Sequence, residues 1–232
     1  MKKILLIIVL GIVMCSVCCT SNETGNAILV EIGKCQFNET LFADIQNIAE
    51  IDEECQYILK VKKAIDETRL RLINTEDMIG KFSQLSNIYE LRKCLYMMQA
   101  VPEKFMVCSE LFMNHNSYLV DLFNEPADKV SQYAKLKYAI IKCDATIIEV
   151  GKSVLEAQEE FRASAKNFNF VLAQVLEQVT KNDIVAAAAL LNSKDAIEFR
   201  MSMAKLLNEF YQFESSRAES VMDVYNLYKD VN

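Results

Sequence analysis

The chain has 232 residues, of which 52% are hydrophobic and 25% are charged, and its formal net charge is −7. An acidic chain without a cluster of lysine and arginine residues is a poor match for nucleic acid or for an anionic membrane surface. We therefore expect neither partner, in a chain long enough for one large domain or two small ones.

The first 19 residues have the layout of a secretory signal peptide. Lys2 and Lys3 precede an apolar run from Ile4 to Met14, and mostly small residues follow as far as Cys19. This run is shorter than the ~20 apolar residues of a standard membrane-spanning helix. We predict a signal peptide over residues 1–19 and a secreted, extracellular protein with no membrane contact after cleavage. The alternative is an uncleaved N-terminal segment that serves as an anchor.

Residues 20–39 include Gly25 and Gly33 and show little apolar periodicity, so we expect an irregular leader there. Asn22 and Asn38 each begin an Asn-x-Thr triplet, the acceptor signal for N-glycosylation in a eukaryotic secretory route. We predict both as glycosylation sites in the leader. Two such triplets also arise by chance in a chain rich in asparagine.

Few residues that interrupt helices occur from residue 40 to residue 232. Gly80, Gly151, Pro102 and Pro126 are the only glycines and prolines in this range. So few breakers leave little room for turns between strands, and residues that favour helices are abundant. The sequence therefore predicts an all-α domain over residues 40–232.

Apolar residues recur at three- and four-residue steps throughout this domain, and polar capping residues precede several of the stripes. The spacing predicts helices over about residues 42–65, 75–101, 102–123, 128–180, 184–191 and 195–228. Pro102 suits the first turn of the third helix, and the Asn167-Phe168-Asn169 segment could bend the longest one. The stripes are wider than a heptad seam, which favours one antiparallel bundle of five or six helices over a coiled coil.

The cysteines of the domain suggest disulfide bonds, since an exported chain meets oxidising conditions. Cys94 and Cys108 lie equally far from the predicted reversal between the second and third helices, so we predict a disulfide between them. Closing this loop would contribute roughly 3 kcal/mol. Cys35 with Cys55 is a second candidate pair, and Cys55 with Cys143 competes with it. The alternative is that these thiols are small buried apolar groups.

The sequence contains no pattern typical of a catalytic or metal site. His115 is the only histidine, and no glycine-flanked nucleophile accompanies it. The cysteine spacings do not match a zinc site, and the glycines are too scattered to cradle a phosphate. We predict no enzyme activity, no cofactor and no metal.

Methionine and phenylalanine are concentrated between residues 95 and 113. Methionine is flexible and polarizable, and therefore suits adaptable surfaces and lipid-lined cavities. Core packing is the first interpretation of this region. The second is that Met97, Met98, Phe105 and Phe112 line a cavity for an apolar ligand.

Two functional hypotheses follow from these features. The first is a secreted all-helical protein-interaction module without catalytic activity, which binds an unknown protein partner. The second is a soluble carrier of a lipid or another apolar small molecule, which needs an internal cavity of a few hundred Å³ or more. Both rest on fold-level reasoning.

Overall fold

The computed structural model of the chain describes residues 25–49, 52–82, 88–126 and 131–231. All regular structure in these ranges is helical, which confirms the all-α prediction for this part of the chain. The first helix occupies residues 25–33. The others are α2 (Glu39–Ile48), α3 (Glu53–Gly80), α4 (Ile88–Asn124), α5 (Gln132–Cys143), α6 (Ala145–Thr180), α7 (Ile184–Leu191) and α8 (Lys194–Val231).

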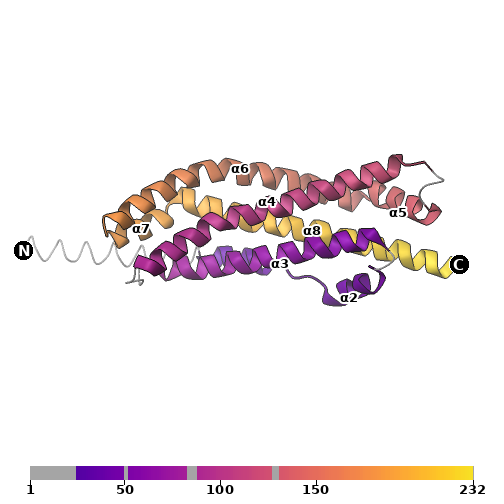
Figure 1. Cartoon of the computed structure of the whole chain (residues 1–232), viewed down its shortest axis with the longest axis horizontal. Coiled ribbons are helices and arrows are strands. Elements are labelled where there is room, and N and C mark those ends of the chain that lie inside the picture. Colours follow the sequence, from indigo (N-terminus) through magenta and orange to yellow (C-terminus); the bar gives the residue numbers. More distant parts are fainter. Residues whose placement is uncertain (1–24, 50–51, 83–87, 127–130, 232) are drawn as a thin grey trace, which may run out of the picture.

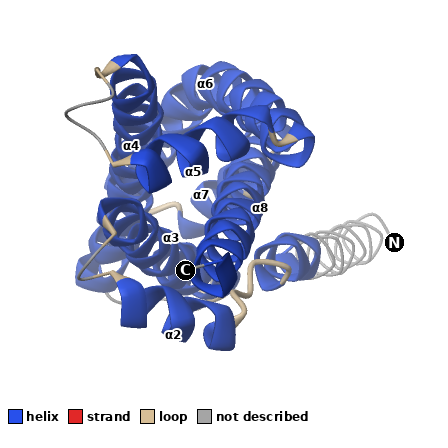
Figure 2. Ribbon diagram, turned by 90° about the vertical axis from the view of Figure 1, so that its right-hand side faces the viewer, coloured by secondary structure: helices blue, strands red, loops and turns tan. Residues whose placement is uncertain are grey.

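Four long helices, α3, α4, α6 and α8, lie side by side along the long axis of the molecule (Figure 1). Each of them runs opposite to the one before it in the chain, as the colours of Figure 1 show. The short helices cover the ends and sides of this group, with α2 beside α3 and α5 beside α4 (Figure 2). The most extensive packing joins α6 to α8, and the next most extensive joins α3 to α4.

A column of phenylalanine rings fills the centre of the bundle. The ring centroids of Phe105 and Phe161 are 5.5 Å apart, and those of Phe161 and Phe199 are 5.7 Å apart. Phe168 stacks on Phe199 at 4.3 Å. Each of these rings is almost fully buried, and burial of one such side chain stabilises the fold by about 1.5–3 kcal/mol. The column joins α4, α6 and α8 into one core.

The irregular leader predicted over residues 20–39 is wrong for residues 25–33, which form a helix, whereas residues 35–38 have no regular structure. Ile28 and Ile32 lie one helical turn apart, and both side chains are fully buried in the main core. Gly25 and Gly33 lie at the two ends of the described helix, so they do not interrupt it. Two apolar contacts with the bundle therefore stabilise a segment whose own periodicity is weak.

The helix predicted to begin near residue 75 is part of a longer one. Asp52 caps the start of α3 by accepting a hydrogen bond from the Glu54 backbone N–H at 2.9 Å, and the helix continues to Gly80. Within it, the Thr75 hydroxyl donates to the Arg71 carbonyl at 2.8 Å. A threonine side chain in the middle of a helix can bond back to the preceding turn, so Thr75 is not a cap here.

The predicted reversal at Pro102 is also wrong, because α4 is one helix from Ile88 to Asn124. A proline inside a helix removes one backbone hydrogen bond and costs about 3 kcal/mol. Leu95, Phe105 and Phe112 are buried on both sides of Pro102 along this helix. Their packing offsets the local cost, and the helix continues through the proline.

The longest predicted helix is divided at Asp144. This residue follows α5 and caps α6, because its carboxylate accepts hydrogen bonds from the backbone N–H groups of Thr146 and Ile147, at 2.9 and 3.4 Å. Residues 167–169 do not interrupt this helix, since α6 continues to Thr180 and Phe168 packs in the core. None of the described helices is long and apolar enough to cross a membrane.

Candidate functional site: an exposed apolar face beside buried ion pairs

The predicted disulfide between Cys94 and Cys108 is wrong. The thiol of Cys108 is free and buried, and its sulfur lies 3.4 Å from the Thr68 hydroxyl oxygen on α3. Cys94 lies in the same helix as Cys108, fourteen residues earlier, which separates the two Cα atoms by about 21 Å. Such a separation is far beyond the reach of a disulfide.

The second predicted bridge is also wrong, because Cys35 and Cys55 are both free and buried. Burial raises the pKa of each thiol to about 12. Cys143 is free and exposed, so the competing pair with Cys55 does not form either. These three buried thiols, Cys35, Cys55 and Cys108, serve as small apolar core groups.

The methionine and phenylalanine residues of α4 separate into two sets. Phe105 and Phe112 are buried, and Phe112 makes edge contacts with Phe210 and Phe213 on α8, at centroid distances of 5.8 and 4.8 Å. Their rings are therefore part of the aromatic core. Met97 is half-buried, and the side chain of Met98 lies outside the described residues.

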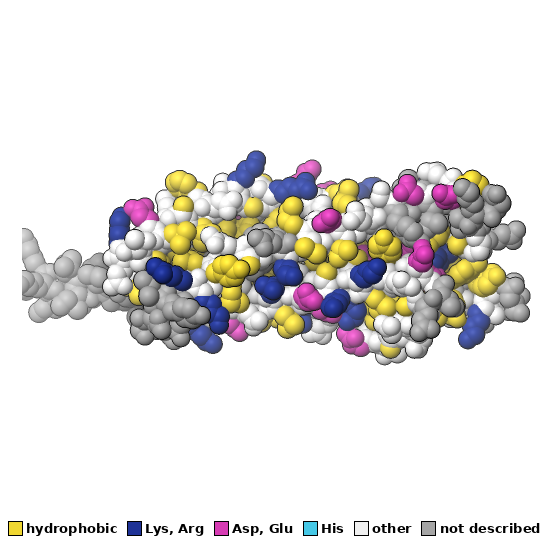
Figure 3. Space-filling view, viewed as in Figure 1, with side chains coloured by type: hydrophobic (Ala, Val, Ile, Leu, Met, Phe, Trp, Pro, Cys, Tyr) yellow, Lys and Arg dark blue, Asp and Glu magenta, His cyan; other side chains and the backbone are white. Residues whose placement is uncertain are grey.

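The other set lies on the outside of α4. Tyr96, Met106 and Met113 are 71%, 64% and 54% exposed, and Val107 is also exposed. These four residues, which we term the α4 face, extend about 25 Å along the helix. Figure 3 shows hydrophobic side chains interspersed with charged ones on the side of the molecule where α3 and α4 lie. α6 also carries four exposed apolar side chains, but they are spread over about 42 Å of the helix, so the α4 face is the denser group; they are Ile148, Leu155, Phe170 and Leu176.

Near the start of α3, the core contains a cluster of charged side chains. The Arg217 Nε atom on α8 lies 3.1 Å from Oε1 of Glu54 on α3, and Nη1 of Arg217 lies 3.9 Å from Oε1 of Glu214. All three side chains are almost fully buried. Burial raises the pKa of Glu214 to about 7, and the nearby Arg217 charge lowers it by less. Two carboxyl groups therefore share one guanidinium in a dry environment.

A second buried pair joins α5 to the same end of α3. The Lys137 ammonium lies 2.6 Å from both carboxylate oxygens of Asp52, which also caps α3. The ammonium also lies 5.7 Å from the ring centroid of Tyr133 and 4.8 Å from that of Tyr138. This pair fixes the position of α5 on the bundle. Neither Lys137 nor Asp52 lines any of the three pockets found among the described residues.

A third buried pair lies at the opposite end of α3, where Nη1 of Arg200 lies 2.9 Å from Oε2 of Glu76. Together the three pairs connect α3 to α5 and α8 at both of its ends. They were not predicted from the sequence, although Arg217 and Arg200 each lie on an apolar stripe of α8, beside Phe213 and Phe199. A charge at such a position is a usable signal for a buried ion pair.

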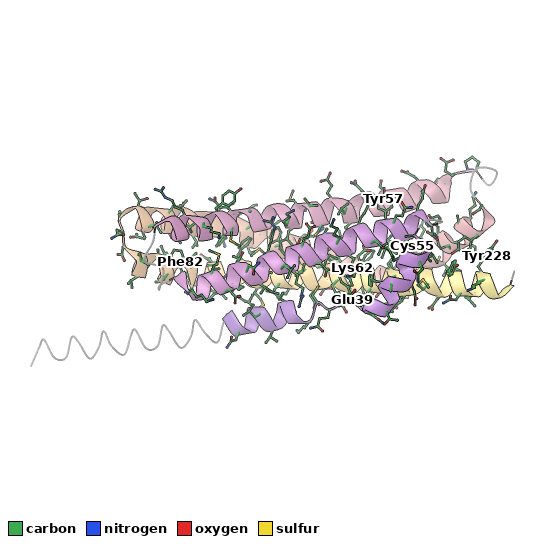
Figure 4. The ribbon with its side chains drawn as sticks, turned by 60° about the horizontal axis from the view of Figure 1, so that its bottom comes forward. Glu39, Cys55, Tyr57, Lys62, Phe82 and Tyr228 are labelled. Atoms are coloured by element: carbon green, nitrogen blue, oxygen red, sulfur yellow. The ribbon has the colours of Figure 1, made fainter. Side chains whose placement is uncertain are left out.

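The three described pockets have volumes of about 260, 520 and 250 Å³. The largest is an open groove between α2 and α3, where Lys62 lies 3.2 Å from Glu39 (Figure 4). None of the three is lined by Met97, Phe105 or Phe112. In the described part of the chain, no group of three or more His, Cys, Asp or Glu residues is placed to hold a metal ion.

The remaining predicted residues have varied positions. Asn38 is exposed and caps α2, where its side-chain oxygen accepts hydrogen bonds from the backbone N–H groups of Thr40 and Leu41. This contact leaves the amide nitrogen of Asn38 available for a glycan, so glycosylation stays a prediction. Asn22 and the signal peptide lie outside the described residues, and so does the side chain of His115.

Comparisons of the chain with protein-family models, curated proteins and solved structures gave no match.

Proposed function

We propose that this chain is a non-catalytic protein-interaction module that acts outside the cytoplasm and binds another protein through the α4 face. The observation that carries the proposal is the exposure of Tyr96, Met106 and Met113. The residue before each of these methionines, Phe105 and Phe112, already fills the core from the inner side of α4. The exposed side chains are therefore not needed to hold the bundle together.

The chemistry of these side chains suits a protein partner. Tyrosine and methionine are enriched in protein interfaces, because tyrosine combines a large apolar area with a polar tip and methionine adapts its shape. Single exposed apolar residues are ordinary on a protein surface. Four of them on one helix, over about 25 Å, form a surface of the length that a partner helix would cover.

The extracytoplasmic part of the proposal rests on the first 19 residues. A basic pair, Lys2-Lys3, followed by the apolar run from Ile4 to Met14, is the pattern read by the secretory machinery. An anchor formed by the same segment is the alternative, and it would place the bundle on the outer side of a membrane.

The carrier hypothesis has weaker support. A carrier of a lipid needs an enclosed apolar cavity, and the rings of Phe105 and Phe112 pack directly against other core rings. Met97, which was also predicted to line such a cavity, is half-buried on the same helix, and the side chain of Met98 lies outside the described residues.

Site-specific photo-crosslinking tests the proposal. A photoreactive phenylalanine analogue replaces Met106 or Met113 in one pair of variants and replaces Phe170, which is 68% exposed on α6, in the control. In the cells that produce the protein, we expect one discrete protein adduct, identified by mass spectrometry, from the two α4 positions and none from the control. No adduct from α4, or the same adduct from Phe170, would overturn the proposal. A lipid-sized mass on the purified protein would favour the carrier.

A further inference from the structure

A pocket lies at the end of the bundle where residues 25–29, the last turns of α3, α7 and the start of α8 meet. Its volume is about 260 Å³, just below the range that is usual for sites of drug-sized ligands. The pocket therefore fits a small metabolite. Its lining combines charged groups from α3 and α8 with the apolar side chains of Leu29, Ile79 and Ala188.

Glu76 lies in the wall of this pocket and is only 5% exposed. Its Oε2 atom accepts a hydrogen bond from Arg200 at 2.9 Å, but its Oε1 atom has no hydrogen-bond partner among the described residues. Burial raises the pKa of Glu76 despite the adjacent guanidinium. A buried acceptor without a donor destabilises the folded protein, and a ligand N–H group would supply the missing donor.

Arg200 has N–H groups besides those that bond to Glu76 and Ala196, and they can donate to an acidic group of the ligand. Its Nη1 atom bonds to Glu76, and its Nε atom donates to the Ala196 carbonyl at 3.3 Å. A guanidinium carries five N–H donors in a fixed fork, and this geometry matches a carboxylate. Glu76 and Arg200 therefore place an acceptor and a set of donors side by side in the wall of the pocket.

The acidic and basic side chains that line the pocket are equal in number. Asp77 and Lys81 complete a set of two acidic and two basic side chains with Glu76 and Arg200. The C-terminal ends of α3 and α7 also meet at this pocket, through Gly80 and Asn192. The partial negative charge of helix C-termini favours a cationic group. A ligand that itself carries one positive and one negative group preserves this balance.

We propose that this pocket binds a small zwitterion, specifically a free amino acid. Its ammonium group donates to Glu76, its carboxylate accepts from Arg200, and its side chain contacts the apolar part of the wall. This site is independent of the α4 face, so either proposal can fail without the other.

Isothermal titration calorimetry of the full chain tests the proposal. The probes are L-alanine, L-leucine, L-lysine and L-glutamate, with putrescine and acetate as probes that carry only one kind of charge. We expect saturable binding of at least one amino acid at one site per chain. Binding of putrescine and of acetate should be at least tenfold weaker.

Two glycine variants provide a matched pair for the same titration. Gly80 lines the pocket, Gly33 does not, and neither has an atom within 4 Å of an added Cβ. Gly80→Leu should fill the pocket and weaken binding at least tenfold, whereas Gly33→Leu should leave it unchanged. Ala188→Leu narrows the pocket from α7 and replaces Gly80→Leu if that variant does not fold.

The proposal is wrong if no amino acid binds, or if the pocket-filling variant binds as tightly as the wild type. Binding of putrescine with the affinity of the best amino acid would also overturn it. In that case the ammonium group alone, without the carboxylate, would account for recognition.

Discussion

Arg217 on α8 forms a salt bridge with Glu54 on α3 in the core of the bundle, with 3.1 Å between Nε and Oε1. A second carboxyl group, that of Glu214, lies 3.9 Å from the same guanidinium, one helical turn before it on α8. Both helices therefore depend on one cation at the level where α3 begins. Removal of one partner of a buried pair leaves an uncompensated charge, whereas a surface pair has little effect on stability.

The Arg217→Met variant should lose about 3–5 kcal/mol of unfolding free energy, because the buried Glu54 and Glu214 carboxyl groups then lose the guanidinium that both of them contact. Urea unfolding followed by circular dichroism measures the loss. The control is Lys205→Met, which removes an exposed 3.0 Å pair between α8 and Glu160 on α6 and should change stability by about 1 kcal/mol or less. A loss in Arg217→Met no larger than in the control would contradict the role of the cluster.

Glu214 should make stability depend on pH. Burial raises the pKa of this carboxyl group from 4.5 to about 7 in the folded protein. The folded state therefore binds a proton more tightly than the unfolded state, and the resulting stability is complete below pH 4.5 and is lost as pH rises to about 7. Glu214→Gln is neutral at every pH, so its stability relative to the wild type should increase across this interval and then level off.

Urea unfolding of both proteins at a series of pH values measures this difference. Glu76 and Glu209 also have raised pKa values, so the pH dependence of the unfolding free energy of the wild type contains contributions from several groups. The difference between the two proteins isolates Glu214. A difference that is constant from pH 4.5 to pH 8 would mean that the folded state does not bind the Glu214 proton more tightly than the unfolded state.

The effects of substituting Lys137 and Asp52 on the free energy of unfolding should be strongly coupled, because the two side chains form a buried ion pair. In Lys137→Met, the Asp52 carboxylate is buried without its cation, and the loss should again be about 3–5 kcal/mol. Asp52→Asn keeps a side chain that can cap α3, so the double variant should be more stable than Lys137→Met alone. A double-mutant cycle of unfolding free energies measures the coupling. A double variant less stable than both single variants would contradict it.

The thiols should differ in reactivity according to burial. Cys35, Cys55 and Cys108 are buried, and burial raises their pKa values to about 12, 12 and 11, while Cys143 is exposed. Because the thiolate is the reactive form, iodoacetamide should label Cys143 in the folded protein and the other three only after unfolding. Peptide mass spectrometry resolves each site. A disulfide-linked peptide that contains Cys35, Cys55 or Cys108 would contradict the free thiols described here.

Periodicity predicted the helical class and many of the core residues of the bundle, but not where helices join. Phe105, Phe161 and Phe199 lie on apolar stripes that are visible in the sequence, and all three are buried. In contrast, Pro102 and Thr75 were interpreted as helix starts, although both lie inside long helices. Local capping signals predict a boundary only where tertiary packing does not outweigh them, and packing on both sides of Pro102 does so here.

The disulfide prediction failed for the same reason. It depended on a reversal at Pro102, and a continuous helix places Cys94 and Cys108 too far apart. The ion pairs could not be predicted as pairs, because Glu54 and Arg217 are distant in the sequence and meet only when α3 packs on α8. The exposure of Met106 and Met113 also depends on which side of α4 faces the core, since the region is apolar on more than one side.

Binding through the α4 face is tested most directly by the affinity of this chain for the partner that crosslinks to α4, measured with purified proteins by calorimetry. The double variant Met106→Lys/Met113→Lys should bind that partner at least tenfold more weakly than the wild type, and Phe170→Lys should bind it unchanged. Equal affinities for the wild type and the α4 variant would contradict the claim that this chain acts through the exposed face of α4.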